Sequence, residues 1–432
     1  MSNEIKGSTS RVAGLLWDAE AAFFLGEDAR DALAALDAAL ADAPEKVRAA
    51  HAEPRAALGA LLDAYGGAGG GRGAGSGAGG TAPADHPAGR AYRDRFGVAG
   101  VERVRASTGT RLFKIPAETF PGHVNNVYLM CDGDVTALWD AGSGMAKARE
   151  QIHRGIRLAG TVYGEPVTAR DLTHVILSHG HIDHFGDVGY WRREYGAKLV
   201  VHELDARVLT NFEERVVVAS KDLGVFLARA GVEEARVARF EEMYLFSKSL
   251  FQSVEVDVRL RDGELVAGRW PAVHTPGHCP GHICLYVGDV LLTGDQVLLR
   301  VTPHQSPQSI TPFCGLENYV RSLAKLRARA GVRIGLPGHY ELIDDVYRRI
   351  DETLAHHRER LEKVKSICAA RPHTVAEVAG ELFHHLTGYS ELLGLEEAGA
   401  HVEYLSHLGL LKIANLEDVT KARDPVLRYR TV

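Results

Sequence analysis

The run of six residues from His179 to His184, HGHIDH, constrains this chain more than any other part of its sequence. It places three imidazoles and one carboxylate directly after the short apolar stretch HVILS. The stretch predicts a buried strand, and the glycine inside the motif predicts a turn at its end. Imidazole and carboxylate groups suit Zn²⁺ and other first-row metals, and their close spacing lets them converge. The motif therefore predicts a metal site at the end of a strand.

Three more residues of the same chemistry follow: His278 in HTPGHCPGH, Asp295 in LLTGDQ and His339 in GLPGHYE. Each comes after an apolar stretch and lies beside a glycine. Ligands at the ends of several strands can meet at one edge of a sheet, and glycines permit close backbone approach. Seven ligands are too many for one tetrahedral zinc, so the set favours two metal ions bridged by a shared carboxylate and a hydroxide.

The chain before these motifs is helical in pattern. Residues 1–65 are rich in Ala and Leu at helical spacing and predict two or three amphipathic helices. Pro44 lies where one helix is expected to end, and Pro54 either starts or kinks the next. Ten of the 46 glycines fall in residues 66–80, so residues 66–89 predict a flexible linker. A helical region of this size has little core of its own. We expect it to pack on the main body, on a second copy in a homodimer, or on a partner protein.

The remainder divides into an α/β part and a helical tail. In residues 90–345 apolar strand patterns alternate with helical ones, which predicts an α/β catalytic domain. The pair Asp132-Gly133 predicts a turn between two of its strands, and residues 203–253 predict a helical insertion. Residues 346–432 predict three helices and a short terminal ribbon, which suits a winged-helix-like domain.

Charge and composition exclude several classes of protein. Fifty basic and fifty-six acidic side chains give a formal charge of −6, so bulk positive charge for coating nucleic acid is absent. Only a few basic residues lie near the motifs, namely Arg192, Arg193, Lys198, Arg348 and Arg349. We find no signal peptide and no apolar run long enough to span a membrane. Five cysteines without CxxC spacing suit a reducing compartment, so we expect a cytoplasmic protein.

The HxHxDH, TPGH, GD and PGH motifs, in this order over about residues 103–347, resemble those of the metallo-β-lactamase superfamily. The resemblance implies an αβ/βα sandwich with two metal ions, Zn²⁺ or alternatively Fe or Mn, at one edge. Carried over by motif, one ion takes His179, His181 and His278, the other takes Asp183, His184 and His339, and Asp295 bridges them. Asp140 in LWDAGSG matches a residue that supports the ligand loop through hydrogen bonds.

Departures from neighbouring subgroups narrow the expected activity. The commonest zinc β-lactamases have a cysteine in place of Asp295 and lack the histidine after the aspartate of the first motif, which disfavours antibiotic hydrolysis. Flavodiiron proteins have a glutamate in place of His181. The segments from His274 to Gln296 and from Leu336 to Val364 are most similar to the beta-lactamase-like protein 2 and glyoxalase II-like branch. Members of that branch include an endoribonuclease, and related sequences act as acyl-carrier thioesterases.

The resemblance also implies a mechanism. A metal-bridging hydroxide attacks a carbonyl carbon or phosphorus, and Asp183 or Asp295 relays the proton as a catalytic residue. We predict a hydrolase for the ester or thioester bond of a small acyl substrate. The alternatives are a phosphodiesterase or endoribonuclease acting on single-stranded RNA, which the acidic balance disfavours, a di-iron oxygenase, and a metal-stabilised scaffold without activity.

Weaker candidates surround the proposed ligands. His282 is expected to hydrogen-bond a ligand or to be a buried structural histidine, and His304 to rim the site on a Pro-rich loop. Tyr340 either donates to a substrate oxygen or packs against its loop. Phe246 and Phe251 in the insertion form either a lid for an acyl chain or part of the core. Cys279 has no supporting triad, so a nucleophilic role is disfavoured.

Overall fold

The computed structural model describes residues 3–66, 84, 87–249, 251–422 and 424–432. The chain forms two compact units. The first comprises residues 1–105, 110–138 and 144–173, and the second comprises residues 106–109, 139–143 and 174–432. Most of the predicted linker at residues 66–89 lies outside the described residues. The predicted domain boundaries remain a prediction.

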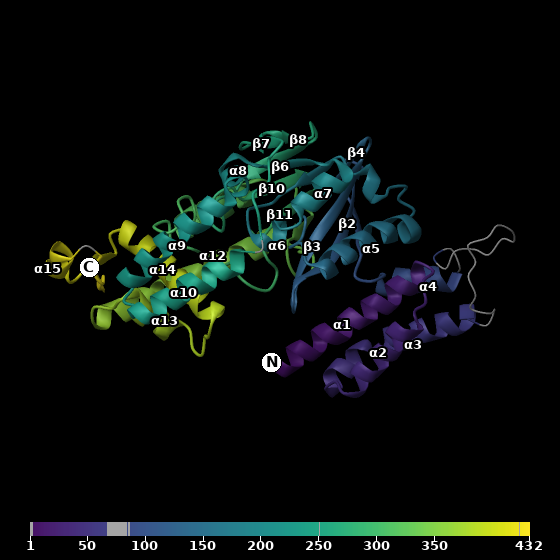
Figure 1. The fold of residues 1–432 in the computed structure, drawn as a ribbon, viewed down its shortest axis with the longest axis horizontal. Helices are drawn as coiled ribbons and strands as arrows, with labels where there is room; N and C mark the ends of the chain where they lie inside the picture. Colours follow the sequence, from purple (N-terminus) through teal and green to yellow (C-terminus); the bar gives the residue numbers. More distant parts are fainter. Residues whose placement is uncertain (1–2, 67–83, 85–86, 250, 423) are drawn as a thin grey trace. The chain divides into compact units, whose positions relative to one another are not determined.

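The elements of the first unit combine helices with antiparallel strands (Figure 1). In chain order they are α1 (Asn3–Phe24), α2 (Arg30–Ala41), α3 (Glu45–Gly66), α4 (Pro87–Phe96), β1 (Glu102–Arg105), β2 (Arg111–Phe120), β3 (His123–Asp132), β4 (Val135–Trp139), α5 (Ala146–Tyr163) and the short 3-10 helix η1 (Ala169–Asp171). Strands β1, β2 and β3 pair antiparallel, and the predicted turn at Asp132-Gly133 leads from β3 to β4. Helix α5 lies close against β2, since a Cβ added to Gly155 would stand 2.3 Å from a methyl carbon of Ile115.

The N-terminal helices pack within this unit. Helix α2 ends before Pro44 as expected, and Pro54 lies inside α3. Buried Glu20 on α1 accepts hydrogen bonds from the hydroxyl of Tyr92 on α4 and from the N–H of Ala99, the latter at 2.7 Å. Helix α4 begins at Pro87, two residues before the predicted end of the linker, because proline suits the first turn of a helix and the Tyr92 side chain is buried.

The second unit contains the remaining strands and helices. Its elements are β5 (His174–Ile176), α6 (Ile182–Phe185), α7 (Val188–Tyr195), β6 (Lys198–His202), α8 (Glu203–Thr210), α9 (Phe212–Arg229), α10 (Glu234–Lys248), β7 (Val258–Leu260), β8 (Leu265–Val266), β9 (Trp270–His274), β10 (Ile283–Val287), β11 (Val290–Gly294), α11 (Leu316–Ala328), β12 (Ile334–Pro337), α12 (Val346–Ala370), α13 (Val375–Leu382), α14 (Tyr389–His407), β13 (Leu411–Ile413), α15 (Leu416–Lys421) and β14 (Tyr429–Thr431).

Strand order brings the ends of distant segments together. Strands β5, β6 and β7 run parallel, and a second sheet has the order β12-β11-β10-β9-β8. Helices α11 and α12 cover one face of the second sheet, where Tyr286 and Leu291 pack with Tyr319 and Ile350. Sheets flanked by helices, with helical regions towards both ends of the chain, agree with the predicted sandwich fold.

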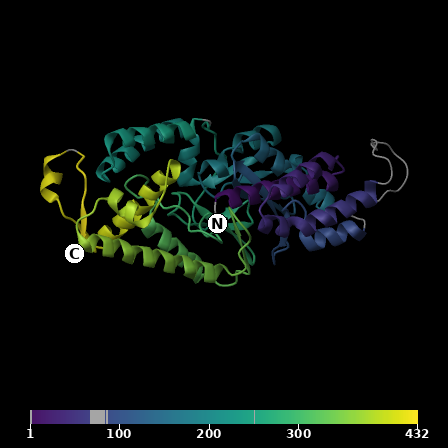
Figure 2. The same cartoon turned by 90° about the horizontal axis from the view of Figure 1, so that it is seen from below.

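The predicted insertion and the C-terminal helices form one hydrophobic core. Phe240 and Leu223 of the insertion helices pack with Val364 of α12 and with Leu395 and Val402 of α14. Figure 2 shows α14, in yellow-green, between the teal insertion helices and the long green α12. The described residues of the C-terminal region form four helices, α12 to α15, where three were predicted, and the predicted ribbon is the antiparallel pair of β13 and β14. Among the described residues no helix is long and apolar enough to cross a membrane.

Candidate metal centre

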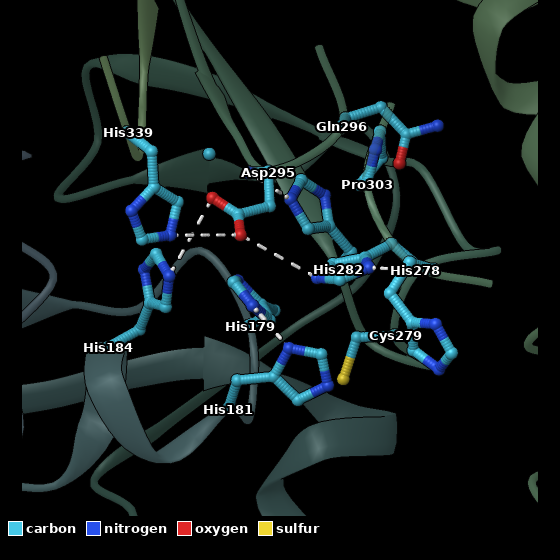
Figure 3. Close-up of polar contacts among 12 residues, drawn as sticks. His179, His181, His184, His278, Cys279, His282, Asp295, Gln296, Pro303 and His339 are labelled. Atoms are coloured by element: carbon cyan, nitrogen blue, oxygen red, sulfur yellow. Dashed lines mark hydrogen bonds and ion pairs between the residues drawn. The ribbon is translucent and has the colours of Figure 1, made fainter. Parts of the chain in front are cut away.

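The seven predicted ligands all follow strands of the second unit. The HxHxDH motif comes after β5 and runs into α6, and His278 lies in the loop between β9 and β10. Asp295 is the first residue after β11, and His339 lies two residues beyond the end of β12. As the sequence predicts, the loops at these strand ends meet. Figure 3 shows the side chains of His179, His181, His184, His278, Asp295 and His339 converging on one region.

His179, His181 and His278 form the first group. Nε2 of His179 lies 3.0 Å from Nδ1 of His181, and one ring nitrogen from each of the three side chains falls within 4.8 Å of the others. Burial lowers the pKa of all three rings, so they are held in the neutral form that offers a lone pair. This arrangement suits one metal ion.

Asp183, His184 and His339 form the second group. Oδ2 of Asp183 lies 3.4 Å from Nε2 of His184 and 3.5 Å from Nε2 of His339. Burial alone would lower the pKa of both histidines, but the nearby carboxylates outweigh it and raise both values. The same carboxylates would attract a metal cation at this position.

The Asp295 carboxylate lies between the two groups (Figure 3). Its Oδ2 is 3.3 Å from Nε2 of His339 and 3.7 Å from Nε2 of His278, while its Oδ1 is 3.6 Å from Nε2 of His184. Burial would raise the pKa of this carboxyl, yet His339 and His184 hold it well below its usual value. An ionised carboxylate in this position can serve both groups.

Two buried atoms test whether this arrangement fits metal ions. Nε2 of His278 and Oδ1 of Asp295 make no hydrogen bond to any residue that the structure describes. Leaving a buried polar atom without a partner costs about 1–3 kcal/mol. Their neighbouring ligand atoms are too far for a hydrogen bond but suitably placed to share an ion bound at about 2.0–2.2 Å. The donor set therefore fits Zn²⁺, and it equally fits Fe or Mn.

Asp140 supports the HxHxDH loop as its motif implies. Its carboxylate accepts hydrogen bonds from the N–H of Ser178 at 2.8 Å and from the Ser178 hydroxyl at 2.9 Å, and it contacts Nδ1 of His184 at 2.9 Å. Asp140 has a φ of 65°, a strained conformation for a residue with a side chain. The contacts orient His184 with Nε2 towards the other ligands.

Asp205 on α8 is a supporting residue that the sequence did not single out. It is fully buried and accepts hydrogen bonds at 2.8 Å from the N–H of Gly180 and from the N–H of Gly281. It thus ties the HxHxDH loop to the loop that carries His278. Burial raises the pKa of the Asp205 carboxyl to about 6. Its position shortly after strand β6 was the one available signal, because the candidate ligands also follow strands.

His282, His304 and Tyr340, the weaker candidates, differ in what their side chains contact. Nε2 of buried His282 accepts a hydrogen bond from the N–H of Asp295 at 3.1 Å, so His282 does touch a candidate ligand. The His304 side chain contacts Glu396 on α14 at 2.8 Å, and its backbone oxygen accepts from Nδ1 of His278 at 2.8 Å. Tyr340 is partly exposed and has a φ of 69°.

Residues of the insertion also separate into two kinds. Phe251 is buried and packs with the rings of Phe185 and Phe212, so it belongs to the core, whereas Phe246 is 78% exposed. Cys279 is buried beside Asp205, and burial raises the pKa of its thiol well above the usual value. A thiol held in its protonated form is a poor nucleophile.

A lysine of the insertion lies within electrostatic range of two candidate ligands. The charge of Lys248, at the end of α10, acts on Asp183 and His181, and its ammonium stands 5.6 Å from the Tyr244 ring. Burial lowers the pKa of this lysine.

Another buried group of histidines lies in the helical core. Nδ1 of His357 is 3.1 Å from Nε2 of His401, whose Nδ1 donates to the backbone oxygen of Glu397 at 2.7 Å. The Arg360 guanidinium donates to the Glu397 carboxylate at 2.5 Å. Because a cation already neutralises this carboxylate, the group is better described as hydrogen-bonded packing than as a metal site.

Comparison with known proteins identifies the family to which these motifs belong. Residues 121–339 match the profile described as the metallo-beta-lactamase superfamily. The chain is 25% identical over 294 residues to the probable metallo-hydrolase YqjP of Bacillus subtilis, covering 65% of this chain and 86% of that protein. It is 25% identical over 246 residues to the acyl-coenzyme A thioesterase MBLAC2 of Bos taurus, covering 54% and 80% respectively. A metallo-beta-lactamase family protein from Thermus thermophilus has a similar crystal structure, with a TM-score of 0.59 and 28% identity over 74% of this chain and 98% of that one.

Proposed function

The chain belongs to the metallo-beta-lactamase superfamily, and on that premise we propose that it is a dinuclear metal-dependent hydrolase that cleaves the thioester or ester bond of an acyl substrate. The observation that carries the proposal is the position of Asp295. Its carboxylate has one oxygen directed towards His184 and the other towards His278 and His339. A carboxylate shared in this way suits two ions held side by side.

Two metal ions bound there would supply a nucleophilic hydroxide at neutral pH and polarise the carbonyl oxygen of the substrate. The protein's own residues then have separate tasks. Asp140 and Asp205 hold the ligand loops in place through hydrogen bonds. Asp183 is the more exposed of the two candidate catalytic carboxylates, with 15% of its side chain accessible against 9% for Asp295. It is therefore the better placed to hold a proton beside an arriving substrate.

A thioester substrate is supported by one relative and by one side chain. The relative is the acyl-coenzyme A thioesterase, which covers more than half of this chain. The side chain is Lys248, whose ammonium suits a negatively charged carrier on the leaving group.

RNA as a substrate has less support because two of the basic residues near the motifs, Arg192 and Arg349, are already engaged. Arg192 forms an ion pair with Asp257 at 2.9 Å, and Arg349 donates to the backbone oxygens of Leu298 and Val301. A track of free positive charge leading to the candidate ligands would be needed for a polyanion.

The proposal is tested with protein stripped of metal and reloaded with two equivalents of Zn²⁺. We expect hydrolysis within an acyl-CoA and acyl-glutathione panel and no cleavage of a labelled single-stranded RNA. Asp295→Ala is the inactive control, and it should also lower the metal content. Turnover of RNA alone would support the endoribonuclease alternative. Purification with iron, together with oxygen consumption, would support the oxygenase alternative.

A further inference from the structure

The orientation of one candidate ligand depends on a loop that carries no ligand. Nδ1 of His278 donates to the backbone oxygen of His304 at 2.8 Å. This hydrogen bond places the proton on Nδ1 and leaves Nε2 as the lone-pair nitrogen. It also fixes the rotation of the ring, so that Nε2 is directed towards Asp295, 3.7 Å away. The position of the His304 carbonyl therefore sets the direction of His278.

Three glutamates of helix α14 hold that loop. Glu396 contacts Nε2 of His304 at 2.8 Å, and Glu397 accepts a hydrogen bond from the N–H of Gln305 at 2.8 Å. Two turns further along the helix, Glu403 accepts from the N–H of Gln308 at 2.9 Å and from the Ser309 hydroxyl at 2.7 Å. Residues seven apart lie on the same face of a helix, so these side chains form one continuous edge. We call Glu396, Glu397 and Glu403 the α14 latch.

Helix α14, which carries the latch, is held in place by packing on several sides. A Cβ added to Gly399 of α14 would stand 3.0 Å from a ring carbon of Pro307, so the helix axis lies close against the loop. Leu395 and Val402 anchor the same helix in the hydrophobic core that it shares with the insertion. Arg360 of α12 pairs with Glu397 at 2.5 Å, so a second helix also restrains that carboxylate. The loop therefore has few alternative positions while α14 is in place.

We infer that the α14 latch positions His278 as a metal ligand. The C-terminal helical region would then contribute to metal binding by orienting this histidine. The inference rests on the proposed dinuclear site and adds positioning residues to it. Glu396 is the informative member, because Glu397 also pairs with Arg360, whereas the contact that the structure gives Glu396 is to His304. Groups that orient a metal-bound histidine through its second ring nitrogen typically change metal affinity about 10–100-fold.

The test is a double-mutant cycle on metal-free protein titrated with Zn²⁺ against a competing chelator. Glu396→Ala and His304→Ala should each lower the affinity for one of the two zinc ions about tenfold and leave the affinity for the other unchanged. The double variant should bind zinc no more weakly than His304→Ala alone, because that substitution already removes the contact of Glu396 with His304. Glu391→Ala is the matched control, since Glu391 lies on the same helix but pairs with Arg236 of α10. It should leave both affinities unchanged.

Thermal unfolding of the metal-free variants separates positioning from general stability. The inference predicts that Glu396→Ala and Glu391→Ala unfold at similar temperatures although only the first loses metal affinity. The inference is overturned if Glu396→Ala lowers the affinity for both ions equally or for neither. It is also overturned if Glu391→Ala lowers a zinc affinity as well. The wild type could bind two ions and hydrolyse no thioester, while Glu396→Ala still lowers the affinity for one ion. In that case the proposed activity is wrong and the inference about the α14 latch holds. A wild type that binds fewer than two ions overturns both.

Discussion

Single residues determine how closely the ligand loops approach one another. Asp205 is the clearest case, because one buried carboxylate pairs with two backbone N–H groups that belong to different loops. The geometry at Gly338 is equally restrictive, since a Cβ there would stand 2.3 Å from Oδ1 of Asp295 and 2.9 Å from a ring carbon of His184. Both positions therefore control the site without supplying a ligand atom.

We expect Asp205→Ala to lower the free energy of unfolding by roughly 2–4 kcal/mol, because it leaves two buried N–H groups without acceptors. It should also reduce the bound zinc. Chemical denaturation and metal analysis measure the two effects. Asp289→Ala is a suitable control, because Asp289 likewise joins two segments, at Ser107 and Arg333, but lies away from the ligand loops. Full zinc content in Asp205→Ala would show that the two loops keep their positions without this carboxylate.

Gly338→Ala is expected to abolish binding of at least one ion, because the added methyl group would displace Asp295 or His184. The far-UV circular dichroism spectrum should stay unchanged, since the clash is confined to side chains. Gly380→Ala, where the added carbon meets nothing within 4 Å, should leave metal binding intact and slightly stabilise helix α13. Two equivalents of zinc in Gly338→Ala would contradict the proposed position of the bridging carboxylate.

At the scale of elements, the insertion helices are built into the C-terminal helical core. Phe240 of α10 is 2% exposed and packs within the same cluster as residues of α12 and α14, whereas Phe246, six residues later on α10, is 78% exposed. The two phenylalanines thus provide a comparison of buried and exposed aromatic rings on one helix.

Phe240→Ala should reduce the stability of this helical core by about 3–5 kcal/mol, because it removes a buried ring and leaves a cavity. Phe246→Ala should change it by less than about 0.5 kcal/mol. Urea denaturation followed by far-UV circular dichroism measures both values. Similar losses in the two variants would mean that the exposed ring packs against something in solution.

The sequence was sufficient to predict many of the elements. The strand before the HxHxDH motif, the turn at Asp132-Gly133 between two strands and the helices of residues 346–432 were predicted because apolar runs, turn residues and helical periodicity are local signals. The short strands β8 and β9 and helix α4 were missed, since each is too short or too polar to show a period. The shared core of insertion and C-terminal helices was also missed, because it depends on contacts between residues more than a hundred positions apart.

The candidate site was predictable to a similar degree. The seven candidate ligands stand in motifs, and the structure brings them together. Asp205 and Glu396 stand in no motif, and only the folded chain places their carboxylates beside the ligand loops. The winged-helix-like assignment, the cytoplasmic location and the partner of the N-terminal helices remain predictions.

For the molecule as a whole, stability should depend on pH through Glu20. Burial raises the pKa of this carboxyl from 4.5 to about 7, although the contacts from Tyr92 and Ala99 favour its charged form. A folded-state pKa above the unfolded value means that stability is fully present below about pH 4.5 and is lost as the pH rises through 7. The difference corresponds to roughly 3 kcal/mol.

We therefore expect Glu20→Gln to become progressively more stable relative to the wild type between pH 5 and pH 8. Denaturation of the metal-free proteins at several pH values measures the difference and avoids the effect of metal binding. Glu27→Gln, which removes an exposed carboxylate paired with Arg154, is the control for the loss of a surface charge. A constant difference between wild type and Glu20→Gln across this range would mean that Glu20 is charged in the folded protein at every pH tested.

The contacts of helix α14 bear on how the chain can be shortened. A chain ending at residue 345 would keep all seven candidate ligands and look complete by its motifs. It would nevertheless lack the carboxylates that hold residues 304, 305, 308 and 309. It would also expose the apolar faces of the insertion helices that pack on α12 and α14. For protein engineering, the smallest transferable unit is therefore set by these contacts and extends well past the last ligand.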